Sequence, residues 1–383
     1  MTNLSRRRIL QAGPAGLGLG LFGTASAAPA AGTDSTRVRM SGDGLGLTVS
    51  EQARLLSRLA DEGRIARDNY SNGGVVAELE EAFAAVLGKE RAVFMPTGTL
   101  ANQLAVRALA GPGGGRAILQ AESHLYNDSG DCVQTLSQIP IVPLGFGRAA
   151  FTLDEVKDVV ERTAGGRVAR PVRVISIETP VRRKSGETFP QPELDRITGY
   201  AKEQGIRLHL DGARLFLQSA CSGVDVAETA RPFDTVYVSL YKYFNAPSGA
   251  ILAGPRALLD GMFHTRRMFG AGLPAAWPYA AIPLHYLPGF VARFRQAVET
   301  SESFIRNLGG DDRFSVERIT PGTNLFRLQV AGARTETLRT RLRDQGVDLP
   351  APRSGGAFLL GVNETWNRAA PEDLAHRFRT AAD

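Results

Sequence analysis

Lys242 stands where a lysine amine could act as a nucleophile. It follows an apolar run, residues 236–240, and precedes Asn245-Ala246-Pro247-Ser248-Gly249, a segment rich in turn formers. The pattern predicts a side chain at the end of a strand. A lysine desolvated there has a lowered pKa, and its neutral amine can attack an aldehyde. A lysine taken alone is more often a surface residue, so this interpretation depends on the neighbouring segments.

A carboxylate lies at the end of another strand-like run, in His209-Leu210-Asp211-Gly212-Ala213-Arg214. Such a carboxylate can keep the nitrogen of a pyridine ring protonated, and the protonated ring then accepts electrons. Asp211 taken alone could equally be a helix N-cap or a turn residue.

Two more segments offer groups of the same kind. Thr97-Gly98-Thr99-Leu100-Ala101-Asn102 links a strand to a helix, where backbone N–H groups and threonine hydroxyls can hold a phosphate. Ser123-His124 follows a short strand, where an imidazole could lie flat on an aromatic ring. A lone histidine at such a position would otherwise more often be structural.

The elements that must position these residues alternate between strand and helix. The helical spacing of apolar residues predicts helices at 76–87, 153–163 and 193–203. Strands are predicted at 92–95, 117–120, 139–144, 172–178, 206–210, 235–240 and 250–253. Strands separated by helices indicate an α/β fold with a mainly parallel sheet, whose ligand crevice lies outside the carboxyl ends of the strands.

The chain divides into four predicted segments. Residues 46–310 form a large α/β domain, and residues 311–383 form a small C-terminal α+β domain with strands at 314–319, 324–330 and 357–362 and helices at 335–345 and 371–382. Residues 31–45 are a linker and N-terminal arm. A length of 383 residues exceeds what one hydrophobic core usually supports, which agrees with two domains.

Residues 1–30 carry a predicted export signal. Ser5-Arg6-Arg7-Arg8-Ile9-Leu10 is a twin-arginine motif, and Ala25-Ser26-Ala27 is a cleavage site after a Gly/Ala/Leu-rich stretch. We expect a periplasmic or secreted protein without stable membrane association once the signal is removed. The two cysteines, Cys132 and Cys221, are expected to be buried free thiols.

The composition excludes several classes of protein. Hydrophobic residues make up 43% of the chain and charged residues 22%, as in soluble globular proteins. The net charge of +6 is spread along the chain, so nucleic-acid binding is not expected. No metal site is expected either.

In the order in which they occur, these motifs resemble the threonine aldolase branch of the β-eliminating lyase family, which has the aspartate-aminotransferase (type I) fold of pyridoxal phosphate enzymes. The likeness covers nearly everything after the linker. Its residues are Leu79-Glu80, Gly88-Lys89-Glu90, Ala92-Val93-Phe94, Pro96-Thr97-Gly98-Thr99, Ala101-Asn102, Ser123-His124, Glu178, 208–216, Ser239-Leu240-Tyr241-Lys242, Ala246-Pro247 and 266–272.

The resemblance implies a cofactor, pyridoxal 5′-phosphate, and a role for each matched residue. Lys242 would bind the cofactor aldehyde as a Schiff base, Asp211 would pair with the ring nitrogen, and His124 would stack on the ring. Phosphate and other cofactor contacts would come from Gly98, Thr99, Arg214 and Ser239. Substrate contacts would come from Arg214, Ser41 and Arg183, and from Tyr70 of a neighbouring subunit. A homodimer or a dimer of dimers is implied.

The chain departs from the family at four places. One is the carboxylate near the stacking histidine, because Ser129 stands at the family's glutamate position. The stretch 357–366, where the family carries an arginine for the substrate carboxylate, contains none. Leu273-Pro274-Ala275 replaces an Arg-Gln pair, and Arg182-Arg183-Lys184 forms a basic cluster after Glu178. This cluster could supply another anion contact, and an arginine from any segment, with Arg183 or Arg353 as candidates, could meet the substrate carboxylate.

The resemblance implies a lyase that cleaves or forms the Cα–Cβ bond of a β-hydroxy-α-amino acid, giving glycine and an aldehyde, with His124 as the base. A different outcome on the same cofactor, β-elimination or transamination, is the main alternative. A non-catalytic exported binding protein on the same fold is the third.

Overall fold

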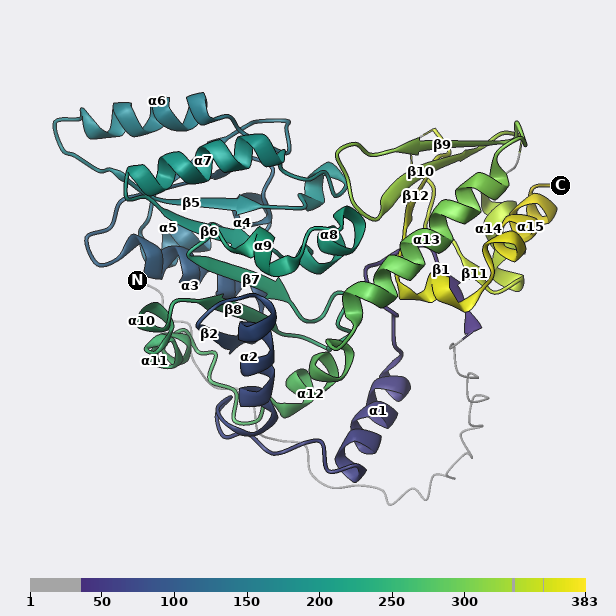
Figure 1. Ribbon diagram of the computed structural model, residues 1–383, viewed down its shortest axis with the longest axis horizontal. Coiled ribbons are helices and arrows are strands. Elements are labelled where there is room, and N and C mark those ends of the chain that lie inside the picture. Colours follow the sequence, from purple (N-terminus) through teal and green to yellow (C-terminus); the bar gives the residue numbers. More distant parts are fainter. Residues whose placement is uncertain (1–35, 333–334, 354) are drawn as a thin grey trace, which may run out of the picture. The chain divides into compact units, whose positions relative to one another are not determined.

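The computed structural model describes residues 36–332, 335–353 and 355–383 (Figure 1). The predicted signal peptide and residues 31–35 of the predicted arm lie outside this range. Within it, no helix is both long and apolar enough to cross a membrane. Cys132 and Cys221 are free thiols, and Cys132 is buried.

A seven-stranded sheet forms the centre of the larger part of the fold (Figure 1). Strand β8 runs antiparallel to both of its neighbours, β2 and β7, while the pairs from β7 to β4 are all parallel. This confirms the predicted α/β fold with a mainly parallel sheet. The strand order is β2 (Arg91–Met95), β8 (Ala250–Gly254), β7 (Thr235–Ser239), β6 (Arg207–Asp211), β5 (Val172–Glu178), β3 (Arg116–Gln120) and β4 (Ile141–Leu144).

Different helices cover the two faces of this sheet. Successive residues of one strand enter different cores, since Val236 and Val238 of β7 pack in the larger cluster and Tyr237 packs in a second one. The larger cluster joins the sheet to α2 (Gly74–Val86), α6 (Leu153–Ala164), α7 (Gln191–Glu203) and α8 (Leu215–Ser222). Helix α3 (Gly98–Ala110) packs on the other face.

The remaining helices connect these elements or lie near the chain ends. They are α1 (Val49–Asp61), α4 (His124–Asn127), α5 (Cys132–Ser137), η2 (Arg182–Lys184), α9 (Val226–Ala230), α10 (Arg256–Leu259), α11 (Met262–Met268), α12 (Trp277–Tyr286), α13 (Phe290–Leu308), α14 (Thr335–Asp344), η3 (Glu364–Arg368) and α15 (Pro371–Ala382).

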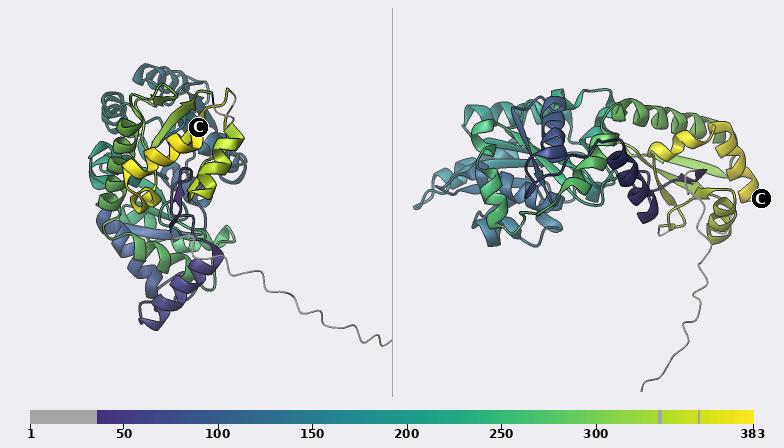
Figure 2. Two further views of the ribbon diagram at one scale, coloured as in Figure 1. Left: turned by 90° about the vertical axis from the view of Figure 1, so that its right-hand side faces the viewer. Right: turned by 90° about the horizontal axis from the view of Figure 1, so that it is seen from below.

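A second core lies in the C-terminal part of the chain. Its antiparallel sheet has the order β12 (Phe358–Gly361), β10 (Leu325–Val330), β9 (Phe314–Arg318), and α13, α14 and α15 lie together beside it (Figure 2). Phe304 of α13 meets the Trp366 and Phe378 rings edge to face, at 5.4 and 5.0 Å between centroids. These aromatic contacts fix α13 on the small sheet.

Two elements join this C-terminal core to earlier parts of the sequence. Strand β1 (Val38–Arg39), from the predicted arm, pairs in parallel with β11 (Val347–Asp348), and Val38 is completely buried. Helix α13 contributes Phe294 to the larger core and Phe304 to the C-terminal one. The predicted boundary at residue 311 therefore stays a prediction, because packing is continuous through α13.

Candidate active site

One cavity of about 860 Å³ opens at the carboxyl ends of β5 and β6, beside the start of α3 and the loop after β7. This volume is in the range of sites for drug-sized ligands. Predicted site residues in its lining are Ser41, Gly98, Thr99, His124, Asp211, Arg214 and Lys242. Side chains from distant parts of the sequence thus converge on one space.

Lys242 is the only one of the five lysines in the sequence that lines the cavity. Its Nζ donates to the Tyr241 hydroxyl at 3.1 Å and lies 4.4 Å from the centre of the Tyr241 ring. The loop that carries it closes on itself, because Leu240 N donates to Gly249 O and Ala246 N donates to Leu240 O. The amine is therefore presented from a turn held at both ends.

Asp211 ends strand β6 and is held by a chain of buried polar groups. Its Oδ2 accepts from Asn102 Nδ2 at 2.6 Å, and its Oδ1 accepts from Ala213 N at 3.2 Å. Asn102 Oδ1 lies 2.9 Å from His209 Nε2, and His209 Nδ1 lies 2.8 Å from Thr235 Oγ1. Burial lowers the His209 pKa to about 3, so this imidazole is neutral. A neutral ring that accepts from Thr235 donates through Nε2 to Asn102, which fixes the amide and hence the Asp211 carboxylate.

Glu178 ties the His124 segment to the end of β5. The Glu178 carboxylate accepts from His124 N at 2.6 Å and from Arg182 N at 2.9 Å. Burial, together with the nearby Asp211 charge, raises the Glu178 pKa to about 8. Strand β5, helix α4 and helix η2 are therefore joined by one buried carboxyl group.

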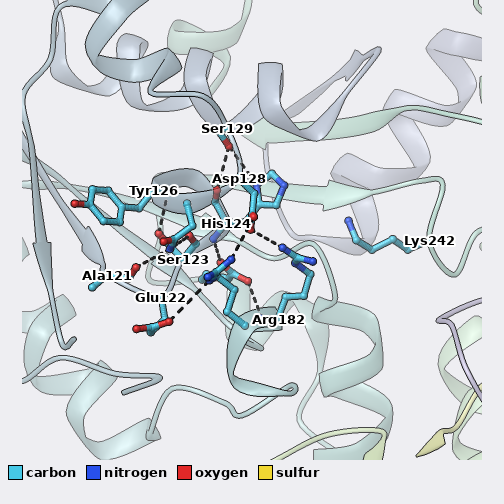
Figure 3. A network of polar contacts seen from close by, with 12 residues as sticks. Ala121, Glu122, Ser123, His124, Tyr126, Asp128, Ser129, Arg182 and Lys242 are labelled. Carbon is cyan, nitrogen blue, oxygen red and sulfur yellow. Dashed lines mark hydrogen bonds and ion pairs between the residues drawn. The ribbon is translucent and has the colours of Figure 1, made fainter. Parts of the chain in front are cut away.

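The His124 ring faces the cavity and contacts Ser129. Ser129 Oγ donates to His124 O at 3.2 Å and lies 3.3 Å from His124 Nδ1. A hydroxyl that donates to the carbonyl accepts from Nδ1–H, which leaves Nε2 as a proton acceptor. Burial lowers the His124 pKa, Asp211 opposes this shift and Lys242 adds to it, so both charges act on the ring. In Figure 3, the Lys242 side chain points toward the His124 ring.

The start of α3 provides an anion site. Thr97 caps the helix, and its hydroxyl accepts from Leu100 N at 3.2 Å. The first backbone N–H groups of a helix have no hydrogen-bond partner inside it, so they can donate to a bound anion. A Cβ on Gly98 would lie 2.0 Å from the Tyr237 hydroxyl, so only glycine fits there. An aromatic aldehyde with a phosphate group fits this set, because the amine, the acid and the helix start line one cavity.

In the described part of the chain, three arginines also line the cavity, and two of them have carboxylate partners. Arg214 pairs with Asp43, at 3.0 Å from Nε and 2.8 Å from an Nη nitrogen to the same oxygen. Arg182 pairs with Asp128 at 2.5 Å. Arg39, which the sequence did not single out, is the third.

Three predicted contacts lie outside the cavity. Arg183, predicted as a substrate contact, does not line it, because its guanidinium turns to Asp128 and Glu122, at 3.4 and 3.9 Å. The neighbouring Arg182 lines the cavity instead. Ser239 is completely buried and does not reach the lining. Tyr70 is 40% exposed, away from its own chain's cavity, with the Arg267 guanidinium 4.7 Å from its ring centre.

A family model for beta-eliminating lyases matches residues 59–332. A low-specificity L-threonine aldolase of Saccharomyces cerevisiae is 30% identical over 213 residues, 55% of this chain and 54% of that protein. The alanine racemase TOXG of Cochliobolus carbonum is 31% identical over 208 residues, 54% of this chain and 52% of that protein. The matched region thus spans about half the length of these two relatives.

A solved structure agrees with the sequence matches. The crystal structure of a Listeria monocytogenes protein assigned as an L-allo-threonine aldolase superposes with a TM-score of 0.74 at 28% identity. The superposition covers 91% of this chain and 96% of that one. The family model matches well over half of the chain, and the structural likeness extends over both cores. The chain therefore belongs to the beta-eliminating lyase family, whose members depend on pyridoxal phosphate.

Proposed function

We propose that this protein is a threonine-aldolase-like lyase, which cleaves or forms the Cα–Cβ bond of a β-hydroxy-α-amino acid. The observation that carries the proposal is the single cavity that gathers Lys242, Asp211 and His124. Cleavage would release glycine and an aldehyde. The threonine aldolases among the relatives support this direction of the chemistry.

The residues that would hold pyridoxal phosphate line one cavity. The Lys242 amine would bind the aldehyde, Asp211 would hold the ring nitrogen, and the start of α3 at Gly98 and Thr99 would bind the phosphate. When bound, the cofactor supplies a protonated ring that accepts the electron pair released at Cα.

His124 is the group that would take the proton from the β-hydroxyl. Its lowered pKa keeps the imidazole neutral near pH 7, and the Ser129 contact leaves Nε2 free to accept. As the Cα–Cβ bond breaks, the hydroxyl carbon becomes the aldehyde carbonyl, and a proton added at Cα completes glycine. Glu178 would hold the ring in place through the His124 backbone N–H.

Incubation of the cofactor-loaded protein with L-threonine, L-allo-threonine and β-phenylserine tests this proposal. The wild type should release glycine and aldehyde in equal amounts, Lys242→Ala should release none, and His124→Asn should be slower by about 10²- to 10⁴-fold. A loaded protein that releases neither product from any β-hydroxy amino acid would refute the proposal. Conversion of the cofactor to its amine form would indicate transamination, and racemisation of alanine would indicate the reaction for which TOXG is named.

We also propose export by the twin-arginine route, which the motif Ser5-Arg6-Arg7-Arg8-Ile9-Leu10 supports. The route carries folded proteins, which suits an enzyme that takes up its cofactor before export. Replacing Arg6 and Arg7 together by lysine should retain the protein in the cytoplasm of its host. Unchanged export of that variant would contradict the proposal.

We further propose a homodimer or dimer of dimers in which Tyr70 faces a neighbouring subunit's cavity. Tyr70 and Met268, which are 40% and 74% exposed, support an interface at this surface. Light scattering on the purified protein should give the mass of two or four chains. A mixture of Tyr70→Ala and Lys242→Ala chains should regain activity through sites built from both, and a monomeric active enzyme would refute the arrangement.

A further inference from the structure

Arg39 lines the cavity and, unlike Arg182 and Arg214, has no carboxylate partner among the residues that the structure describes. Arg214 is paired with Asp43, and the two side chains are only 18% and 15% exposed. Arg182 is paired with Asp128. Within residues 36–332, 335–353 and 355–383, Arg39 forms no ion pair, and its Nη1 donates only to Gly46 O, at 3.2 Å.

The backbone of Arg39 is fixed by two buried side chains. Arg39 N donates to Thr365 Oγ1 at 2.9 Å, and Arg39 O accepts from Asn363 Nδ2 at 3.0 Å. Asn363 and Thr365 are completely buried. Both belong to the stretch 357–366 that contains no arginine. This stretch therefore holds an arginine of β1 at the cavity instead of supplying its own.

The guanidinium itself lies against a glycine. A Cβ on Gly46 would lie 2.3 Å from Arg39 Nη1 and 2.4 Å from Cζ, so any larger residue would displace the group. The backbone at Gly46 has φ +65°, a conformation that also favours glycine. The position of the Arg39 side chain is thus built into the loop that follows β1.

We propose that Arg39 binds the α-carboxylate of the substrate, an inference that rests on the proposed α-amino acid substrate. A carboxylate that enters the cavity needs a cation, and Lys242 is required for the cofactor. Arg39 can present two N–H donors to it without first breaking an ion pair, and Arg214 would have to leave Asp43. The ligand class recognised at Arg39 is therefore a carboxylate next to a primary amine.

The test compares two ligands that differ only in this group. Glycine and methylamine are titrated into the cofactor-loaded protein, and binding is followed by the change in cofactor absorbance. Arg39→Gln should weaken glycine binding by about 10- to 100-fold, since a hydrogen bond to a charged group is lost. Methylamine binding should change less than about twofold. Arg39→Lys should recover part of the glycine affinity, because it keeps the charge without the planar pair of donors.

Arg54→Gln is the matched control, because Arg54 is exposed on α1 and the substitution removes the same charge. It should bind glycine like the wild type. Gly46→Ala should weaken glycine binding in the wild type but add little in the Arg39→Gln background, since both changes remove the same contact. Cofactor absorbance and the unfolding midpoint verify that each variant is folded and loaded.

Two results would overturn the assignment of Arg39: glycine binding within twofold of the control in loaded Arg39→Gln, or an equal loss of glycine and methylamine affinity. The lyase proposal can fail separately. If the wild type binds glycine but releases no aldehyde from any substrate, the reaction is wrong, and the ratio of glycine to methylamine affinities still decides the role of Arg39.

Discussion

Replacing Asn102 by leucine should break the buried chain that orients Asp211. Asn102 is completely buried, and its amide joins Asp211 Oδ2, at 2.6 Å, to His209 Nε2, at 2.9 Å. Leucine has nearly the same volume but no polar atoms. The substitution therefore removes one hydrogen-bond partner from each of two buried groups and leaves the packing of α3 almost unchanged.

The size of the effect follows from these two groups. A buried group that loses its partner costs about 1 to 3 kcal/mol, so the two groups together should lower the free energy of unfolding of Asn102→Leu by about 2 to 6 kcal/mol. It should also weaken pyridoxal phosphate binding, because the Asp211 carboxylate then keeps, among the described residues, one hydrogen bond, from Ala213 N. Urea unfolding followed by circular dichroism measures the first effect, and a cofactor titration followed by absorbance measures the second.

The next residue in the same helix provides the control. Gln103 is also buried, but its Nε2 has no hydrogen-bond partner within the described part of the chain. Gln103→Leu removes a buried donor that is already unsatisfied, so stability should change by less than about 1 kcal/mol. If Asn102→Leu and Gln103→Leu cost the same, or if Asn102→Leu binds the cofactor as tightly as the wild type, the reasoning about Asp211 is refuted.

Two further predictions concern the stability of the fold. Burial raises the Glu80 pKa from 4.5 to about 7, so the folded protein holds this proton more tightly than the unfolded chain does. The stability that this provides, on the order of 3 kcal/mol, should be present below pH 4.5 and lost as the pH rises through 7. Urea unfolding between pH 5 and pH 8 should show this fall in the wild type and a flatter profile in Glu80→Gln; equal slopes would contradict it. Gly98→Ala should destabilise the protein by about 1 to 3 kcal/mol through its clash with Tyr237, whereas Gly199→Ala, inside α7 with open space around it, should stabilise it by about 0.5 to 1 kcal/mol. Thermal unfolding of both variants checks the pair, and a neutral Gly98→Ala would show that Tyr237 can move aside.

Local sequence patterns were sufficient to predict most of the fold. The predicted helix 153–163 is α6 (Leu153–Ala164), and the predicted strand 172–178 is β5 (Val172–Glu178). In each segment the apolar residues recur at one regular spacing, and α6 begins with the Thr152–Glu155 capping box. Strand β1 was not predicted because two residues, Val38 and Arg39, are too few to show an alternation of apolar and polar residues. Their partner β11 also lies some three hundred residues later in the chain.

Some residues of the candidate site could likewise be predicted from local sequence, and others could not. Lys242, Asp211 and Gly98 could be predicted because each lies where a strand ends or a helix starts, which the local sequence marks. Arg39 could not, because its position depends on Thr365 and Asn363 and on the absence of a Cβ at Gly46. Spacing does not distinguish Arg182 from Arg183. Both pair with Asp128, and Arg183 also lies near Glu122, a contact between distant segments that the local sequence does not mark.

The central claim is that Lys242 binds the cofactor aldehyde, and reductive trapping tests it most directly. The loaded protein is treated with sodium borohydride, which makes the bond between the cofactor and a lysine permanent, and the labelled peptide is identified by mass spectrometry. The chain has five lysines, Lys89, Lys157, Lys184, Lys202 and Lys242, so the result is unambiguous. We predict one phosphopyridoxyl group per chain, on Lys242, and none in Lys242→Ala; a label on any of the other four lysines, or no label at all in the wild type, would contradict the account.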